Sequence, residues 1–215
     1  KKYSAVLLAG EGAVPEFKNA KLGTYTAITV KGDPSGGRPY ILDAAFDLDP
    51  SLPELPKVGI TAPVSAAYSS ISWFGAGPDE SYPDRLAGAF LGRYQHKAAE
   101  METPYVMPQE SGNRSLVRNF TFETPGAQAG KPRALSVWCG RPLNMSVSRY
   151  TQENLLEALH TLELIDTMDN GKGFFTLNID AAQRGVGTAT CGPDTRNEYR
   201  VRAGFFTLRV YLGGK

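Results

Sequence analysis

Hydrophobic and polar residues alternate with a period of two along much of the chain. In 42–49, for example, leucine, alanine, phenylalanine and leucine interleave with three aspartates and an alanine. Because successive side chains of a β-strand point to opposite faces, this pattern predicts a strand with one buried and one solvent-exposed face. The same alternation recurs in five later segments: 135–139, 143–147, 175–179, 199–201 and 206–212. Many strands and few helices are therefore expected.

Segments rich in glycine, proline, asparagine and aspartate separate these runs and supply the positive or fixed φ angles that turns require. They lie at 32–37, 124–132, 169–173 and 202–204. Short loops between alternating strands favour antiparallel pairing over βαβ crossovers. We predict an all-β antiparallel sandwich.

One segment departs from the alternation and predicts a short helix over 152–160. Thr151 is a suitable N-cap, and Glu153 lies in the positive first turn. Four leucines then follow a roughly helical stripe, at 155, 156, 159 and 162.

Two further segments are less regular. A second helical turn is considered over 83–93, where Pro83 favours a helix start and two glycines oppose its continuation. We therefore expect one or two short helices in the chain. The segment 49–63 is proline-spaced, and we interpret it as a loop between strands.

The composition is that of a soluble globular protein, because 41% of the 215 residues are hydrophobic and 21% are charged. The formal net charge is only +1 and no basic run occurs, so neither a nucleic acid nor a membrane is expected as a partner. The N-terminal KKYSAVLLAGEG has too short an apolar run for a signal peptide. The first residue is not methionine, which suggests a mature product or a piece of a longer chain.

Cys139 and Cys191 are the only cysteines, and we interpret them as buried free thiols rather than a disulfide. No cysteine and histidine spacing suits zinc, so no metal site is predicted. Glycosylation sequons begin at Asn113, Asn119 and Asn144 and would matter only in a secretory pathway. The sequence leaves the compartment open.

Residues for catalysis are few. His96 and His160 are the only imidazoles, and we interpret His96 as solvated and His160 as a hydrogen-bonded structural residue. The glycine-rich segments 75–81 and 185–193 lack the ending of a phosphate-binding loop and are interpreted as ordinary loops.

A glycosidase needs two carboxylates across a sugar, and Glu80, Asp84 and Glu110 all lie in polar segments. Ion pairs with nearby arginines are the simpler interpretation of these acids. Arg114 and Arg118 have forked donors suited to clamp carboxylates such as Glu80 or Glu110.

Four ordered stretches carry a resemblance to a known family. They are WFGAGPDESYPDR (73–85), TPYVMPQESGNRSLVR (103–118), SVSRYTQENLLEALHTLEL (146–164) and LNIDAAQRGVGTATCGPDTRNEYR (177–200). In order and spacing they resemble the C-terminal β-sandwich domain of the large β-galactosidases of glycoside hydrolase family two, the β-galactosidase small-chain domain. The resemblance covers most of the chain from 73 to 212.

The resemblance implies a supersandwich fold, similar to galactose mutarotase, within an enzyme that hydrolyses lactose. In this family the catalytic glutamates, the galactose-binding residues and the metal ligands lie in preceding domains, chiefly a TIM barrel. It therefore implies no catalytic residue and no cofactor in this chain, with any Mg and Na of the whole enzyme bound elsewhere. It also implies that 1–215 is one domain, truncated at its N-terminus.

In the best-known bacterial member of the family, the late loop of this domain brings a tryptophan to the mouth of the active site, where its ring stacks on the sugar in the acceptor subsite. Alignment on the glycines and proline of 185–193 and on Glu198 places Cys191 at that position, and a thiol offers no aromatic face. The resemblance implies that Thr190, Cys191 and Gly192 line the pocket without acting in catalysis.

The polar segment GPDESYPDR (77–85) is then expected to be a structural loop near the sugar site. The residues expected to tie strands together or support a domain interface are Glu80, Tyr82, Arg85, Glu110, Arg114, Arg118 and His160.

Three functions are open. The first is a non-catalytic domain or small-subunit fragment of a β-galactosidase, whose partners are the catalytic barrel or large subunit and the β-galactoside. The second is a stand-alone lectin-like module, which needs an exposed aromatic platform such as Trp138, although a strand aromatic packed under a loop is the simpler interpretation. The third is an aldose mutarotase-like enzyme, which needs a histidine and a carboxylate at one sugar ring.

Overall fold

A computed structural model describes residues 1–8, 21–33, 37–126, 134–168, 173–187 and 192–214. Its regular structure is almost entirely β. In this described part the strands are β1 (Lys2–Leu8), β2 (Lys21–Val30), β3 (Tyr40–Leu48), β4 (Lys57–Ser65), β5 (Ser70–Gly77), β6 (Phe90–Lys97), β7 (Arg114–Glu123), β8 (Ala134–Ser148), β9 (Phe174–Gln183) and β10 (Phe205–Gly214). The helical elements are α1 (Gln152–Glu157) and the 3₁₀ turns η2 (Leu86–Gly88), η3 (Ala98–Glu100), η4 (Thr161–Glu163) and η6 (Asn197–Tyr199).

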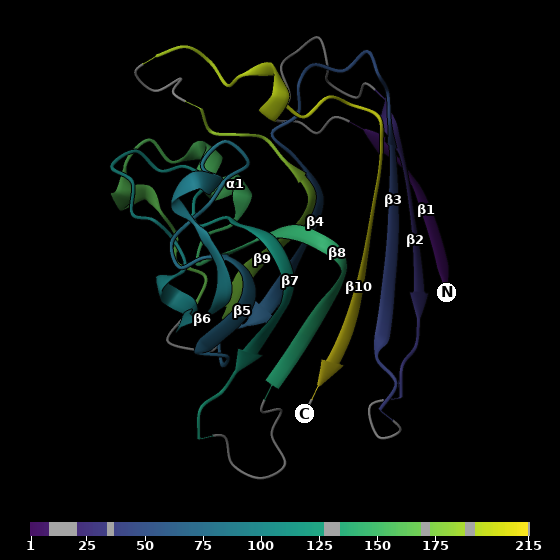
Figure 1. The fold of residues 1–215 in the computed structure, drawn as a ribbon, viewed down its shortest axis with the longest axis vertical. Helices are drawn as coiled ribbons and strands as arrows, with labels where there is room; N and C mark the ends of the chain where they lie inside the picture. The colour runs from purple at the N-terminus through teal and green to yellow at the C-terminus, as the bar shows by residue number, and fades with distance from the viewer. Residues whose placement is uncertain (9–20, 34–36, 127–133, 169–172, 188–191, 215) are drawn as a thin grey trace.

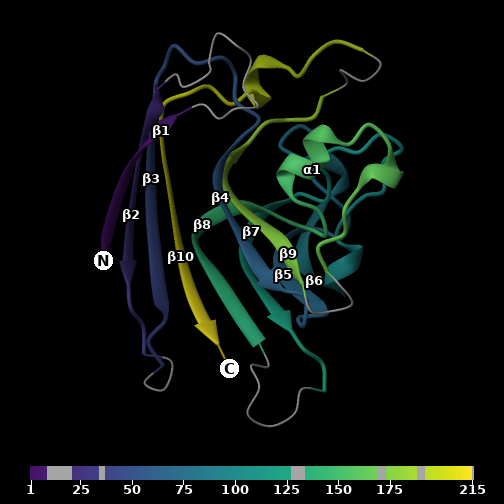
Figure 2. The same cartoon turned by 180° about the vertical axis from the view of Figure 1, so that it is seen from behind.

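All strand pairs are antiparallel and run in the order β1-β2-β3-β10-β8-β7-β5-β6, while β9 pairs with β8 and β4 pairs with β9. Figures 1 and 2 show β1, β2, β3 and β10 as one layer of long strands beside a strongly curved group that contains β4 to β9. The predicted antiparallel all-β sandwich is confirmed.

Strand β8 connects the two parts of the sandwich. The alternation predicted two separate strands here, but the structure has one strand of 15 residues. Its first half pairs with β10, where Val137 faces Leu212, and its second half pairs with β9, where Val147 faces Leu177. The exposed Pro142 lies between the halves, where the register against β7 also shifts. A strand that changes partners in this way must bend.

The inward faces of the strands form one hydrophobic core. Burying such a side chain stabilises the fold by about 1.5–3 kcal/mol. The largest fully buried side chains include Ile71, Trp73, Phe120, Phe122, Leu143, Met145, Phe175 and Leu208.

The prediction of a loop over 49–63 is wrong at its C-terminal end, because β4 begins at Lys57. Pro63 lies within this strand, opposite Thr176 of β9. Proline lacks an N–H donor and is tolerated on a strand with an unpaired edge. Since β9 is the only strand with which β4 pairs in the described chain, the other edge of β4 is unpaired, which makes a proline tolerable in this strand.

Helix α1 begins as predicted and ends early. The Thr151 hydroxyl accepts a hydrogen bond from the Asn154 amide at 3.1 Å, which is the expected N-cap. The helix ends at Glu157 instead of reaching His160. Of the predicted stripe, Leu156, Leu159 and Leu162 are 80%, 63% and 97% exposed. The stripe therefore points to the surface and does not join the core.

The second expected helical turn is the single 3₁₀ turn η2, between 83 and 93. Each 3₁₀ turn in the described chain spans three residues, so one short α-helix is present.

Candidate functional site

The segment GPDESYPDR (77–85) packs against the loop that precedes β7. One oxygen of the buried Glu80 carboxylate accepts hydrogen bonds from the Tyr105 hydroxyl and, at 3.4 Å, from Arg85. The other oxygen accepts from the Gly112 amide at 2.9 Å. Glu80 therefore joins both ends of the loop 105–112 to its own segment.

A second set of contacts joins the same two segments through Ser81. Its amide donates to the Asn113 carbonyl at 2.7 Å, and its own carbonyl accepts from the Asn113 side chain at 2.7 Å. The Ser81 hydroxyl accepts from the Ser115 amide at 3.0 Å. Asn113 is fully buried, so the first of the three sequons is not an accessible glycosylation site.

Tyr82 is 2% exposed. Burial raises the pKa of Tyr82, and the carboxylates of Glu80 and Glu110 raise it further. Its hydroxyl is therefore a neutral hydrogen-bonding group at physiological pH.

The two predicted carboxylate clamps instead contact aromatic rings. The Arg114 guanidinium lies 5.1 Å from the Trp73 ring centroid and donates to the Gly112 carbonyl at 2.9 Å. Arg118 lies 6.0 Å from the Phe74 ring centroid. Burial lowers the pKa of Arg114 to about 10. Planar guanidinium groups stack readily on aromatic faces, and here this contact replaces the expected ion pair.

Glu110 pairs with Lys57 of β4 at 2.8 Å, and Lys57 also donates to Gln152 of α1 at 3.3 Å. Beside this pair lies Asp180 of β9, which is 2% exposed. Burial raises the pKa of Asp180 to about 7. The positive charge of Lys57 lowers this pKa, and the negative charge of Glu110 raises it. One Asp180 oxygen has no hydrogen-bond partner among the described residues. Sequence reasoning missed Asp180; its signal was an acid within the apolar run LNIDAA.

The base of the late loop is held by Asp84. Its carboxylate accepts hydrogen bonds from the amides of Val186 at 3.2 Å and Gly187 at 2.5 Å. A Cβ atom on Gly185 would lie 2.6 Å from the Asp84 carboxyl carbon, so a larger residue there would force the carboxylate to move. The Thr195 hydroxyl donates to the Gly185 carbonyl at 2.9 Å and closes the loop base from its other end.

Four charged residues form an ion-pair network beside this base. Arg184 pairs with Asp194 at 2.7 Å, and Arg200 pairs with Glu54 at 2.9 Å. Longer contacts of 3.7 Å and 3.2 Å link Arg184 to Glu54 and Arg200 to Asp194. Single surface pairs contribute little, but a network holds both ends of the loop in a defined position.

Of the residues predicted to line the sugar pocket, Thr190 and Cys191 lie outside the described residues. Gly192 is described and exposed. Two open cavities flank the loop base. One of about 370 Å³ includes Tyr82, Arg85, Glu110 and Gln183 in its lining, and one of about 700 Å³ includes Asp84, Arg85, Gly187 and Asp194. Gln183 is 9% exposed, and its side-chain oxygen has no hydrogen-bond partner among the described residues.

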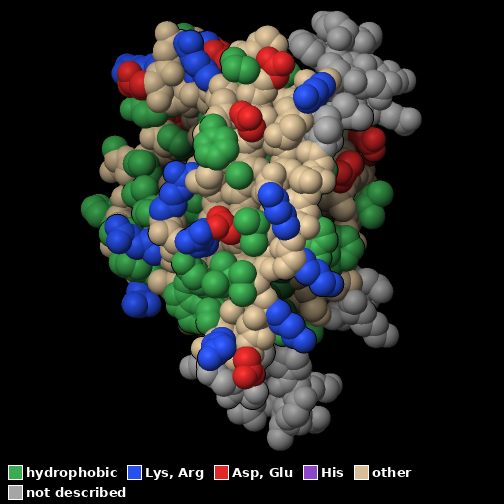
Figure 3. Space-filling model, turned by 90° about the vertical axis from the view of Figure 1, so that its right-hand side faces the viewer, with side chains coloured by type: hydrophobic (Ala, Val, Ile, Leu, Met, Phe, Trp, Pro, Cys, Tyr) green, Lys and Arg blue, Asp and Glu red, His purple; other side chains and the backbone are tan. Residues whose placement is uncertain are grey.

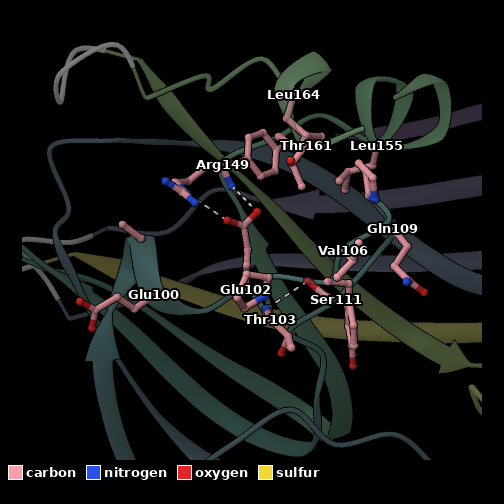
Figure 4. A pocket seen from close by; sticks show the side chains of 15 residues that line it. Glu100, Glu102, Thr103, Val106, Gln109, Ser111, Arg149, Leu155, Thr161 and Leu164 are labelled. Carbon is pink, nitrogen blue, oxygen red and sulfur yellow. Dashed lines mark hydrogen bonds and ion pairs between the residues drawn. The ribbon is translucent and has the colours of Figure 1, made fainter. Parts of the chain in front are cut away.

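A third cavity, of about 650 Å³, lies between the loop 99–111 and the α1–η4 region (Figure 4). Glu102 accepts hydrogen bonds from the Arg149 amide and from its Nε, both at 3.0 Å. Figure 4 shows Leu155 and Leu164 on the helical side of this cavity and Val106 on the loop. The cavity thus has one charged end and one apolar end.

The histidines differ from their predictions. His96 is half-buried, with its ring 5.3 Å from that of Trp73, so it is not simply solvated. His160 is exposed, and its backbone carbonyl accepts from the Glu163 amide at 3.0 Å. In the described part of the chain neither imidazole forms an ion pair with a carboxylate, so no observation favours the mutarotase hypothesis.

Cys139 is a free thiol in β8, and burial raises its pKa to about 12. Within the described ranges, no group of three or more His, Cys, Asp or Glu side chains is arranged to hold a metal ion. No helix among the same residues is both long and apolar enough to cross a membrane.

The chain is similar to several bacterial β-galactosidases. It is 41% identical to the β-galactosidase of Vibrio cholerae over 136 residues. These residues make up 63% of this chain and 12% of that protein. The chain is 33% identical over 153 residues to that of an Arthrobacter species, covering 71% and 15%, and 33% identical over 161 residues to that of Actinobacillus pleuropneumoniae, covering 75% and 14%. The chain thus spans 12 to 15% of the length of these relatives. Residues 24–212 match the β-galactosidase small chain family, and the chain belongs to that family.

Proposed function

We propose that this chain is a non-catalytic domain of a β-galactosidase that packs against the catalytic barrel and forms one wall of the sugar pocket. The observation that carries the proposal is the pair of hydrogen bonds from the Val186 and Gly187 amides to Asp84. They fix the start of the loop to which the resemblance assigns contact with the pocket.

The hydrogen bonds around this contact suit a structural wall of the sugar pocket better than a catalytic centre. The Asp84 carboxylate accepts hydrogen bonds from two backbone amides. The Glu80 carboxylate accepts hydrogen bonds from Tyr105, Arg85 and Gly112. Carboxylate oxygens that already accept hydrogen bonds from the protein itself hold segments of the chain together, which suits a structural role. In the proposal the two catalytic glutamates of the retaining mechanism come from the barrel.

The α1–η4 region supplies a surface for packing against the barrel. Leu156, Leu159, Leu162 and Ile165 are each more than 60% exposed within ten residues. Large aliphatic side chains exposed together in so short a segment are typical of interaction surfaces. The chain spans only 12 to 15% of the length of its relatives. The remainder of such an enzyme is therefore the partner proposed to cover these exposed side chains.

The test compares the chain alone with the chain added to its parent enzyme lacking this domain. We expect the purified chain not to hydrolyse a chromogenic β-galactoside. We expect the domain-deleted parent to be weakly active and to gain activity when the chain is added. Turnover by the purified chain alone, or no gain at saturating chain, would contradict the proposal.

A further inference from the structure

Trp138 and Tyr211 lie side by side on the outer face of the sheet. They occupy facing positions in the pairing of β8 with β10. The Cβ atoms of such a pair lie about 4.5–5.5 Å apart. Trp138 is 46% exposed, whereas Trp73 is 2% exposed in the core. The indole extends over Gly213, where an added Cβ would lie 3.1 Å from the ring.

Polar groups accompany the two rings on this face. Arg209 precedes Tyr211 by two residues, so both side chains leave β10 on the same side. The Arg209 Nε donates to the Asp43 carboxylate of β3 at 3.1 Å. This carboxylate and then the Tyr211 hydroxyl raise the pKa of Arg209. The Arg209 and Asp43 side chains are 53% and 32% exposed, so they remain accessible to water.

A shallow cavity of about 400 Å³ opens beside the Trp138 ring. This volume lies within the range of small-molecule sites. Gly213 and Gly214 leave part of its floor without side chains. Its lining also includes Arg38, Ser136, Trp138 and Tyr211. Figure 3 faces the side of the molecule with β1, β2 and β3 and shows hydrophobic side chains interspersed with Lys and Arg.

A third aromatic residue lies in the same row of facing positions across β5, β7, β8 and β10, but it adds no accessible aromatic surface. Phe74 faces Asn119, which in turn faces Trp138. The guanidinium groups of Arg93 and Arg118 lie over the Phe74 ring at 5.3 Å and 6.0 Å. The accessible aromatic surface of the row is therefore that of Trp138 and Tyr211.

We propose that this face binds a sugar ring, stacked on Trp138 in the cavity and hydrogen-bonded through its hydroxyls to Tyr211, Ser136 and Arg38. A pyranose has an apolar C–H surface and a rim of hydroxyls, and this face offers an aromatic ring beside a donor, an acceptor and a phenol. An apolar protein surface over the same face would desolvate Arg209 and Asp43 without replacing their hydrogen bonds to water. The inference goes beyond the proposed function, which supplies only the choice of galactose and lactose as probes.

Tryptophan fluorescence isolates this site, because the chain has two tryptophans and Trp73 is buried. Acrylamide is expected to quench Trp138 selectively in the free chain. Saturating lactose is expected to reduce that quenching, and calorimetry is expected to give a dissociation constant in the millimolar range or tighter. Mannitol at equal concentration controls for viscosity and hydroxyl content.

Variants assign the effect to the ring. Trp138→Ala is expected to raise the dissociation constant for lactose at least about tenfold, and Tyr211→Phe to raise it less. Phe205→Ala is the matched control, because Phe205 is 69% exposed on the same face of β10 and away from the cavity. Circular dichroism and urea unfolding verify that each variant is folded, and Tyr211→Phe, which keeps its ring, tests the site if Trp138→Ala is unfolded.

The proposal is wrong if lactose and galactose leave the quenching unchanged, or if Trp138→Ala binds them as well as the unmodified chain does. It is also wrong if Trp138→Ala weakens only association with the domain-deleted parent, since the face would then be a contact between domains. All sugar measurements use the chain alone, so they fail or succeed independently of the activity-recovery test above.

Discussion

Asp84 and Gly187 are separated by 103 residues along the chain and joined by a hydrogen bond of 2.5 Å from the Gly187 amide to the Asp84 carboxylate. The polar segment 77–85 therefore has a structural role, because its carboxylates hold two loops in place. Glu80 fixes it to the loop before β7, and Asp84 then fixes the late loop to it. The position of the proposed pocket wall depends on both carboxylates.

Asp84→Ala is expected to release the Val186 and Gly187 amides. Loss of an acceptor that serves two backbone donors costs about 1–3 kcal/mol in the free energy of unfolding. Urea unfolding measures this loss, and amide hydrogen exchange should be faster at both residues. Asp79→Ala, an exposed acid in the same segment, should change stability by less than about 0.5 kcal/mol. Equal effects of the two variants would show that Asp84 has no special role.

Gly185→Ala is expected to disturb the same contact from the other side. Its new Cβ would lie 2.6–2.9 Å from three atoms of the Asp84 carboxylate, so the carboxylate must move. Overpacking of this kind costs about 1–3 kcal/mol. Gly88→Ala is the matched control, because nothing lies within 4 Å of the added atom. The thermal midpoint should fall for the first variant only; a fall of equal size in both would argue against the steric explanation.

Asp180 is expected to make stability depend on pH. Its folded pKa of about 7 lies above the ordinary value of 3.8, because burial disfavours the charged carboxylate. The stabilisation is therefore complete below about pH 4 and is lost as pH rises through about 7. At about 1.4 kcal/mol for each pH unit between the two pKa values, the loss is on the order of 4 kcal/mol.

Urea unfolding of the chain and of Asp180→Asn at pH 5 and pH 8 measures this contribution. The difference in unfolding free energy between the two pH values should shrink in the variant, which has no titrating carboxylate. Asp79→Asn should keep the full difference. A variant with the same pH dependence as the unmodified chain would mean that Asp180 titrates normally.

Local patterns predict the sandwich from four of its strands, β3, β8, β9 and β10, whereas β1, β2, β5, β6 and β7 lie outside the segments with clear alternation. The strand predicted over 199–201 is wrong, because the chain there forms the end of the 3₁₀ turn η6 and a single bridge from Val201 to Leu55. A period of two is a property of each strand by itself, so segments such as 42–48 and 206–212 were identified without knowledge of their partners. The same reasoning missed β4, where Pro63 argued against a strand and only its unpaired edge permits one. Whether a strand lies at an edge is a property of the whole fold.

The contacts of the site were less predictable than the fold. The acids of 77–85 and the arginines of β7 were recognised, but Arg114 stacks on Trp73 and Glu80 binds Tyr105. Charge alone predicts complementary pairs, whereas the real partner depends on which groups the topology brings together. The leucine stripe of 155–162 likewise predicts a helix, but the pattern does not reveal that most of these side chains are exposed.

The exposed leucines provide the last prediction, which concerns association. Leu162 is 97% exposed, so Leu162→Asp should change the unfolding free energy of the isolated chain by less than about 0.5 kcal/mol. If this residue is buried against the rest of the enzyme, its burial contributes about 1.5–3 kcal/mol there, and an unpaired buried charge opposes binding further. Affinity for the domain-deleted parent should therefore fall at least about tenfold.

Titrating the domain-deleted parent with each chain variant and following recovered galactoside hydrolysis measures that affinity. Leu91→Asp is the control, because Leu91 is 52% exposed but lies on β6, away from the α1–η4 region. Reduced recovery for Leu162→Asp, with normal recovery for Leu91→Asp, would assign the interface to the leucine-rich segment. Normal recovery for both would leave these leucines outside the interface and contradict the packing surface proposed above, even if the isolated domain still restored activity.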